Sequence, residues 1–158
     1  MRFSERYRFV ALAESADVTT NGVDTQSINM GKFHSIAFMF NFGAVTANDT
    51  LKFYVGATDA AKTTAVAFKY RLASADVGAA SSDAFGAFTD VTSSGLTLAA
   101  TTFDHKLTIV EFDSQAIPDD TPWLTAEIAG SATTQNISIT AIADPRWASN
   151  AGTPTAVS

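Results

Sequence analysis

The chain has 158 residues and no cysteine, a length typical of one domain that buries its own core without disulfides. Its 10 basic and 16 acidic side chains give a formal net charge of −6, which disfavours a protein that neutralises nucleic-acid phosphates. Charged residues make up only 16% of the chain and apolar residues 46%, so few like charges keep copies of the chain apart. The composition therefore excludes thiolate metal sites and cysteine nucleophiles, and it favours self-association.

The N-terminal segment combines aromatic with basic residues. The aromatic members are Phe3, Tyr7 and Phe9, and the basic members are Arg2, Arg6 and Arg8. Two interpretations stay open: an extended arm over residues 1–12 that lies on an acidic partner, or an ordinary first strand whose arginines face water. The apolar run over residues 10–13 is shorter than the apolar region of a secretion signal, so we expect no signal peptide.

From residue 33 onward the hydrophobic pattern has a period of two, which predicts a mainly β protein. In residues 34–42, Ile36, Phe38 and Phe40 share one face while Ala37 and Met39 share the other, as in a central strand. Further strands are predicted over residues 51–55, 66–72, 107–112, 123–128 and 136–143, with shorter ones near 23–30, 88–92 and 96–98.

Turn-rich segments separate these strands at regular intervals and contain Gly, Asp, Ser and Pro. This spacing predicts an all-β fold, an antiparallel β-sandwich of jelly-roll or Greek-key type, as one domain over residues 1–158. Residues 57–65 and 73–84 are expected to form single helical turns at most. Residues 148–158 are expected to form an extended C-terminal tail. No apolar run is long enough for a membrane helix, so we expect no membrane partner.

The residue types of catalytic and metal sites do not gather in the sequence. The two histidines, His34 and His105, are distant, and no glycine-flanked nucleophilic serine occurs. Glu111 and Asp113 share a strand face, but the spacing of an EF-hand and the glycine loop of a phosphate site are both missing. We therefore predict no catalytic residue, no cofactor and no metal ligand, and a calcium ion held by a loop stays open.

The remaining aromatic residues allow two interpretations. Tyr54, Tyr70, Trp123 and Trp147 either form a platform on which sugars stack or belong to the core and its rim. Trp147 follows Arg146 beyond the last predicted strand, where it is typical of an interface anchor.

Several strand segments resemble small structural proteins of tailed bacteriophages. The similar segments are residues 65–72, residues 91–113, the run Pro122-Trp123-Leu124, and the ending Pro145-Arg146-Trp147-Ala148. The likeness extends from about residue 30 to the end of the chain and consists of strand patterns.

The resemblance implies a head decoration protein, also called a capsid cement protein, that stabilises the shell. It implies two partners, which are the chain itself as a homotrimer and the phage major capsid protein, and no nucleic acid. The implied location is the outer capsid surface of the virion, after synthesis in the host cytoplasm. We expect the interface to contain Arg2, Phe3, Arg6, Tyr7, Arg8, Phe9, Arg146 and Trp147. A tail or host-adhesion module that binds carbohydrate is the alternative, and an enzyme is a more distant one.

Overall fold

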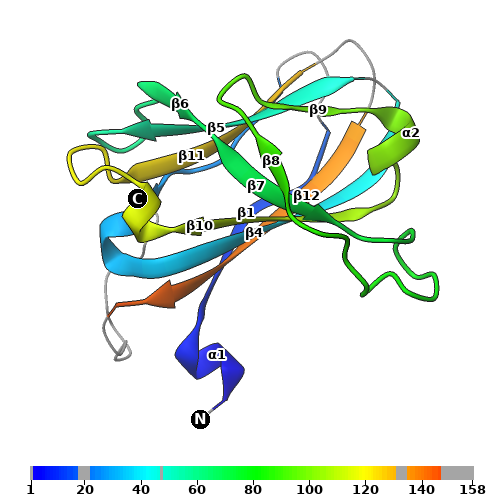
Figure 1. The fold of residues 1–158 in the computed structure, drawn as a ribbon, viewed down its shortest axis with the longest axis horizontal. Helices are drawn as coiled ribbons and strands as arrows, with labels where there is room; N and C mark the ends of the chain where they lie inside the picture. The colour runs from blue at the N-terminus through cyan, green and yellow to red at the C-terminus, as the bar shows by residue number, and fades with distance from the viewer. Residues whose placement is uncertain (1, 18–21, 47, 131–134, 147–158) are drawn as a thin grey trace.

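In the computed structural model, which describes residues 2–17, 22–46, 48–130 and 135–146, two antiparallel sheets pack face to face (Figure 1). Sheet A has the strand order β1 (Arg8–Asp17), β12 (Gln135–Pro145), β4 (Phe33–Val45), β10 (Leu107–Asp113), β7 (Phe68–Leu72) and β8 (Thr89–Val91). Sheet B has the order β2 (Val23–Asp24), β11 (Trp123–Ala129), β5 (Asp49–Gly56) and β6 (Thr64–Val66), while β3 (Ile28–Asn29) pairs with β11 and β9 (Leu96–Leu98) with β5. The predicted all-β sandwich is confirmed.

The strand pairs are nested along the chain. The first strand, β1, pairs with the last, β12; β2 and β3 pair with β11; β4 pairs with β10; and β5 pairs with β6. Such nesting describes one long antiparallel ribbon that wraps around a core, which is a jelly roll. Strands β7, β8 and β9 are inserted between β6 and β10, and β7 and β8 extend sheet A.

A phenylalanine cluster fills the space between the sheets. The core faces of β4, β7 and β10 supply the buried rings Phe38, Phe40, Phe68 and Phe112 from sheet A. Phe53 of β5 enters this group from sheet B, with ring centroids 4.8 Å from Phe112 and 5.0 Å from both Phe38 and Phe68. Strand β4 is the third of six strands, as its aromatic inner face predicts, because a central strand buries the most surface.

Two features of the chain differ from the sequence-based expectation. Residues 66–72 were predicted as one strand, but the chain passes from sheet B to sheet A at Ala67 and divides into β6 and β7. The alternation continues through Ala67, so the period alone does not reveal the crossing. A short helix, α2 (Ala100–Phe103), lies where no helix was expected, and its Phe103 ring packs 6.0 Å from Phe42 and closes one end of the core.

The N-terminal segment expected as an arm divides into two parts. Residues Phe3–Arg6 form a short helix, α1, which projects from the sandwich (Figure 1). From Arg8 the chain continues as β1, the edge strand of sheet A, paired with β12. The expected tail over residues 148–158 lies outside the described residues.

Candidate interaction surface

The outer face of sheet A, the side turned away from the core, carries apolar side chains on its central strands. Side chains alternate between the two faces of a strand, and because Phe38 of β4 points into the core, Ala37 and Met39 point outward. The register places Ile142 of β12 beside Ala37, and Ile109 of β10 beside Met39. These four outward residues are half-buried, so an apolar stripe crosses the sheet where solvent reaches it.

A hollow on this face has a volume of about 490 Å³, and its lining is mainly apolar. We call it the apolar hollow, and its apolar lining consists of Phe9, Met39, Val77, Leu107 and Ile142. Phe9 comes from the edge strand β1 and Val77 from the loop between β7 and β8. The N–H of Val77 donates to the carbonyl oxygen of His105 at 2.8 Å, which fixes this loop at the rim.

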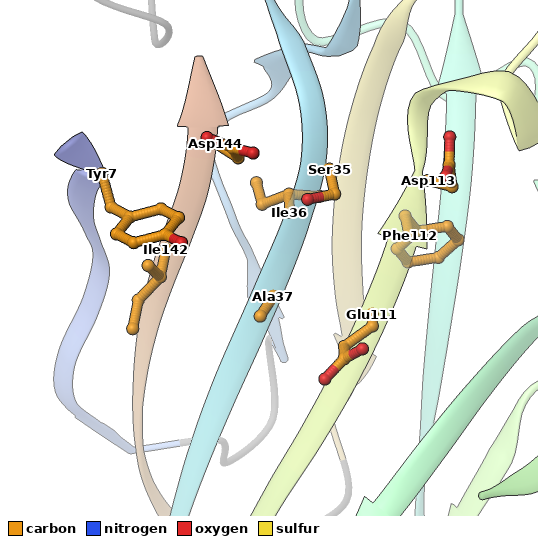
Figure 2. A pocket seen from close by; sticks show the side chains of 9 residues that line it. All are labelled: Tyr7, Ser35, Ile36, Ala37, Glu111, Phe112, Asp113, Ile142 and Asp144. Carbon is orange, nitrogen blue, oxygen red and sulfur yellow. The ribbon is translucent and has the colours of Figure 1, made fainter.

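A second hollow, of about 360 Å³, adjoins the first through Ile142 and is acidic. Figure 2 shows the Tyr7 ring close to Ile142, the Asp144 side chain near the end of β12, and Glu111 and Asp113 on β10. We call it the acidic hollow. The register places the cationic Lys69 beside Glu111, but the Nζ of Lys69 lies 3.2 Å from an oxygen of Asp90. On sheet A this hollow therefore carries the carboxylates of Glu111, Asp113 and Asp144 beside a lysine that is paired elsewhere, so its surface favours the approach of positive charge.

The segment beside these hollows forms a basic aromatic ridge. The Phe3 ring lies 4.5 Å from Tyr7 and 5.6 Å from Phe9 between centroids. The guanidinium of Arg6 lies 5.1 Å from the Tyr7 centroid, within the range of a cation–π contact. Helix α1 buries none of its residues. We call Arg2, Phe3, Arg6, Tyr7 and Phe9 the N-terminal ridge.

The structure separates the other predicted interface residues from this ridge. Arg8 pairs with Ala143, whose side chain is buried in the core, so Arg8 and Phe9 point to opposite faces of sheet A. Arg146 folds onto its own chain: its Nε donates to the carbonyl oxygen of Phe33 at 2.9 Å and its Nη2 to Oγ of Ser114 at 3.0 Å. Trp147 lies outside the described residues.

The outer face of sheet B is partly covered by the chain itself. The loop between β5 and β6 folds back over it, so that a Cβ on Gly56 would lie 2.1 Å from the carbonyl oxygen of Ala61. Lys62 of this loop forms ion pairs with Asp24, at 2.8 Å, and with Glu127. Hydrogen bonds to Asp24, and then to Glu127, raise the pKa of Lys62 above its ordinary value. Sheet A therefore offers the more open face.

The three described aromatic residues of the possible sugar platform, Tyr54, Tyr70 and Trp123, do not lie on one surface. Tyr54 and Trp123 are on the outer face of sheet B, and the register places Thr125, two residues after Trp123, beside Tyr54. Both aromatic side chains are half-buried, and Tyr54 also lies 5.8 Å beneath the ammonium group of Lys62. Tyr70 belongs to sheet A and packs 5.9 Å from Phe103 of the core.

In the described part of the chain, neither histidine joins a cluster of several carboxylates. His105 lies in the turn before β10, where its Nε2 is 3.8 Å from a carboxylate oxygen of Asp104, and both side chains are exposed. His34 is exposed on β4. Among the described residues, no group of three or more His, Cys, Asp or Glu side chains has an arrangement that holds a metal ion. In the same residues no helix combines the length and the apolarity needed to cross a membrane.

The sequence pattern marked the residues of the N-terminal ridge as a group, but it did not identify the apolar residues on the outer face of sheet A and at its rim. The missed residues are Met39, Val77, Leu107, Ile109 and Ile142. The outward positions of β12 are polar except for Ile142, but one signal exists in β10, which carries apolar residues at both parities of the alternation: Leu107 and Ile109 on one, Val110 and Phe112 on the other. Such strands are buried on both faces or present apolar surface on the outer one. Val77 gave no such signal, since only the path of its loop brings it to the rim.

Comparison of the chain with protein families, with curated proteins and with solved structures found no match.

Proposed function

We propose that the protein is a non-enzymatic structural component of a tailed-phage virion, a decoration or cement protein that binds the major capsid protein lattice. The proposal takes the phage origin from the resemblance of the strand segments. The observation that carries the binding role is the open outer face of sheet A, where an apolar hollow adjoins an acidic one. A jelly roll alone supports no particular function, since this architecture serves viral shells, lectins and enzymes alike.

A cement protein needs contact surface and no chemistry. Its contacts with the shell repeat at symmetry-related positions, so modest individual affinities add through multivalency. A chain with only 16% charged residues suits such close repeated packing, because few charges must be desolvated on assembly. We infer homotrimers on the outer surface of the capsid as the form in which the chain acts.

The alternative of a carbohydrate-binding module has less support. A sugar-stacking platform requires several exposed aromatic rings in one plane. Tyr54 and Trp123 share a face but are half-buried, and Tyr70 faces the core. A glycan array that gives reproducible binding, lost on Trp123→Ala, would favour this alternative over the cement role.

The experiment that tests the proposed function locates the protein on the particle. Capsids that lack the chain are mixed with the purified wild-type protein, separated from free protein by sedimentation, and imaged by cryo-electron microscopy. We expect saturable binding at symmetry-related sites on the outer shell and a higher temperature of capsid disruption. Density confined to the tail, or no co-sedimentation at saturating protein, would contradict the cement role.

A further inference from the structure

Exposed large hydrophobic residues gather around the outer face of sheet A. Four such residues occur in the described part of the chain: Phe3 (60% exposed), Val77 (55%), Phe9 (49%) and Phe88 (47%). Phe3 and Phe9 belong to the N-terminal ridge, and Phe9 and Val77 line the apolar hollow. Three of the four thus border one surface, a concentration that marks a site of protein contact.

We infer that a second copy of the chain covers this surface, with the N-terminal ridge of one copy seated in the two hollows of the other. The inference rests on the proposed function, which requires copies of the chain to assemble. It adds which two surfaces meet when they do. Phe3 of one copy enters the apolar hollow of the next. Arg2 and Arg6 of the ridge then face Glu111 and Asp144 of the acidic hollow.

Charge complementarity identifies a copy of the same chain as the occupant. With a net charge of −6, a contact that joins the basic patch of one copy to an acidic patch of the next is favoured over one that joins two acidic patches. The ridge supplies the basic patch, since Arg2 and Arg6 are both exposed and outnumber the one carboxylate of the same segment, Glu5, which accepts a hydrogen bond from the N–H of Arg2. Glu111 and Asp144 form no ion pair with another described residue. The chain therefore carries both halves of a matched contact.

Pairing through the sheet edge is the competing mode of self-association, and β1 is built against it. Its pairing with β12 shifts register between Ala11 and Ala13 and again between Ala13 and Ala16. Such bulges bend an edge strand and interrupt the row of backbone groups that another strand would need. Self-association through the face of sheet A avoids this obstacle.

The ridge borders the hollows of its own chain through Tyr7 and Phe9, but the charged groups that meet, Arg2 and Arg6 on one copy and Glu111 and Asp144 on the other, lie in different parts of the chain, so the contact has a direction. It closes either as a two-fold dimer, in which each copy gives its ridge and receives the other, or as a ring. In both cases every copy uses both patches. The contact can therefore be tested by reversing the charge of the ridge in one variant and of the hollow in another. Mixing the two variants also shows whether the ring has an even or an odd number of copies.

The test compares three proteins by native mass spectrometry and by light scattering at low salt. They are the wild type, a ridge variant with Arg2→Glu and Arg6→Glu, and a hollow variant with Glu111→Lys and Asp144→Lys. We expect the wild type to associate and each variant alone to associate at least about tenfold more weakly, because like charges then meet at every contact. Added salt should weaken association of the wild type.

Mixing the two variants should restore association, because every ridge–hollow contact between unlike variants again joins opposite charges. A two-fold dimer or an even ring is restored fully as alternating complexes with equal numbers of each variant. A trimer retains one like-charge contact, so its mixture would give mixed complexes of even size or a weakened trimer. Either pattern of mixed complexes supports the contact.

A matched control carries the same charge change as the hollow variant, at residues that line neither hollow. Asp119 and Asp120 are exposed in the loop before β11, and Asp119→Lys with Asp120→Lys should leave association unchanged. Circular dichroism and thermal melting confirm that each variant is folded. Equal weakening by the control and the hollow variant would overturn the contact, since a general charge effect would then explain the loss.

Three further results would overturn the inference. The first is a wild type that stays monomeric, and the second is a mixture of variants that forms no mixed complex. The third is association that appears only after deletion of residues 148–158, which would assign the face to the chain's own C-terminal segment. A monomer that still occupies capsids would leave the proposed function standing, whereas mixed complexes without capsid binding would overturn the function and keep the contact.

Discussion

Replacing Phe53 with alanine should remove the ring that joins sheet B to the phenylalanine cluster of sheet A. Phe53 is buried, and its ring lies 4.8 Å from Phe112, 5.0 Å from Phe38 and Phe68, and 6.1 Å from Phe40. These four aromatic neighbours all belong to the opposite sheet, so the substitution opens a cavity between the two sheets. The surrounding rings are held by separate strands and relax only partly into such a space.

The expected loss in the free energy of unfolding is about 4 kcal/mol. Truncation of a buried phenylalanine to alanine costs about 3–5 kcal/mol from lost transfer energy and the cavity that remains. The edge-to-face ring contacts, each worth about 0.5–1.5 kcal/mol beyond area burial, keep Phe53 away from the lower end of that range. With a urea m-value of about 2 kcal/mol/M, the midpoint of unfolding should fall by about 2 M.

Equilibrium unfolding in urea, followed by far-ultraviolet circular dichroism, measures this loss. Phe53→Leu, which keeps most of the volume, should cost about 1.5 kcal/mol and covers the case in which Phe53→Ala does not fold. Phe88→Ala is the control, because it removes an exposed ring and should change stability by less than about 0.5 kcal/mol. A loss below about 1 kcal/mol for Phe53→Ala at an unchanged m-value would refute the reasoning about how the sheets are joined.

Three other substitutions test separate parts of the structure. Gly56→Ala should lower the free energy of unfolding by about 2 kcal/mol, because the new methyl group meets a backbone carbonyl in the loop above it. Asp49→Asn should raise it by about 1–2 kcal/mol, because both carboxylate oxygens of Asp49 are buried without a hydrogen-bond partner. Lys62→Met should lower it by less than about 1 kcal/mol at neutral pH, since the ion pairs with Asp24 and Glu127 are partly exposed and screened.

The Lys62 prediction extends to pH, and its sign follows from the raised pKa. The folded state binds the Lys62 proton more tightly than the unfolded state, so the stabilisation is complete below the ordinary lysine pKa and is lost as the pH rises through the raised value. The difference between wild type and Lys62→Met should therefore shrink in alkaline solution. Urea titrations at neutral and alkaline pH measure it, and a difference that grows with pH would contradict the assignment.

The predictions for Gly56→Ala and Asp49→Asn would each be contradicted by one clear result. A Gly56→Ala protein as stable as the wild type would mean that the loop moves aside at no cost. A loss of stability for Asp49→Asn would mean that the buried carboxylate has a partner the asparagine does not replace. Both are measured by the same urea titration, with the m-value as the check for two-state unfolding.

The strands and the candidate face differ in how much of them the sequence predicts. Strand β4 was placed correctly, including its central position, because its aromatic residues recur with period two. The crossing at Ala67 was missed, because the alternation is the same on both sides of it. The N-terminal ridge was found as a cluster of aromatic and basic residues, but the division into a helix and a strand was not. Pairing of the chain from Arg8 onward with β12, which is a long-range contact, decides where the strand begins.

The sequence by itself determined that this chain is a β-sandwich with an aromatic core, since burial on one side of a strand imposes alternation on neighbouring residues. It also marked the aromatic and basic N-terminal segment. Only the tertiary structure decided that the strands nest as a jelly roll and that Arg8 points away from the ridge. Only the tertiary structure brought Val77 and the carboxylate of Asp144 to one open face. These features depend on which distant strands pair and in what register. The hydrophobic alternation within one strand does not indicate which other strand it pairs with.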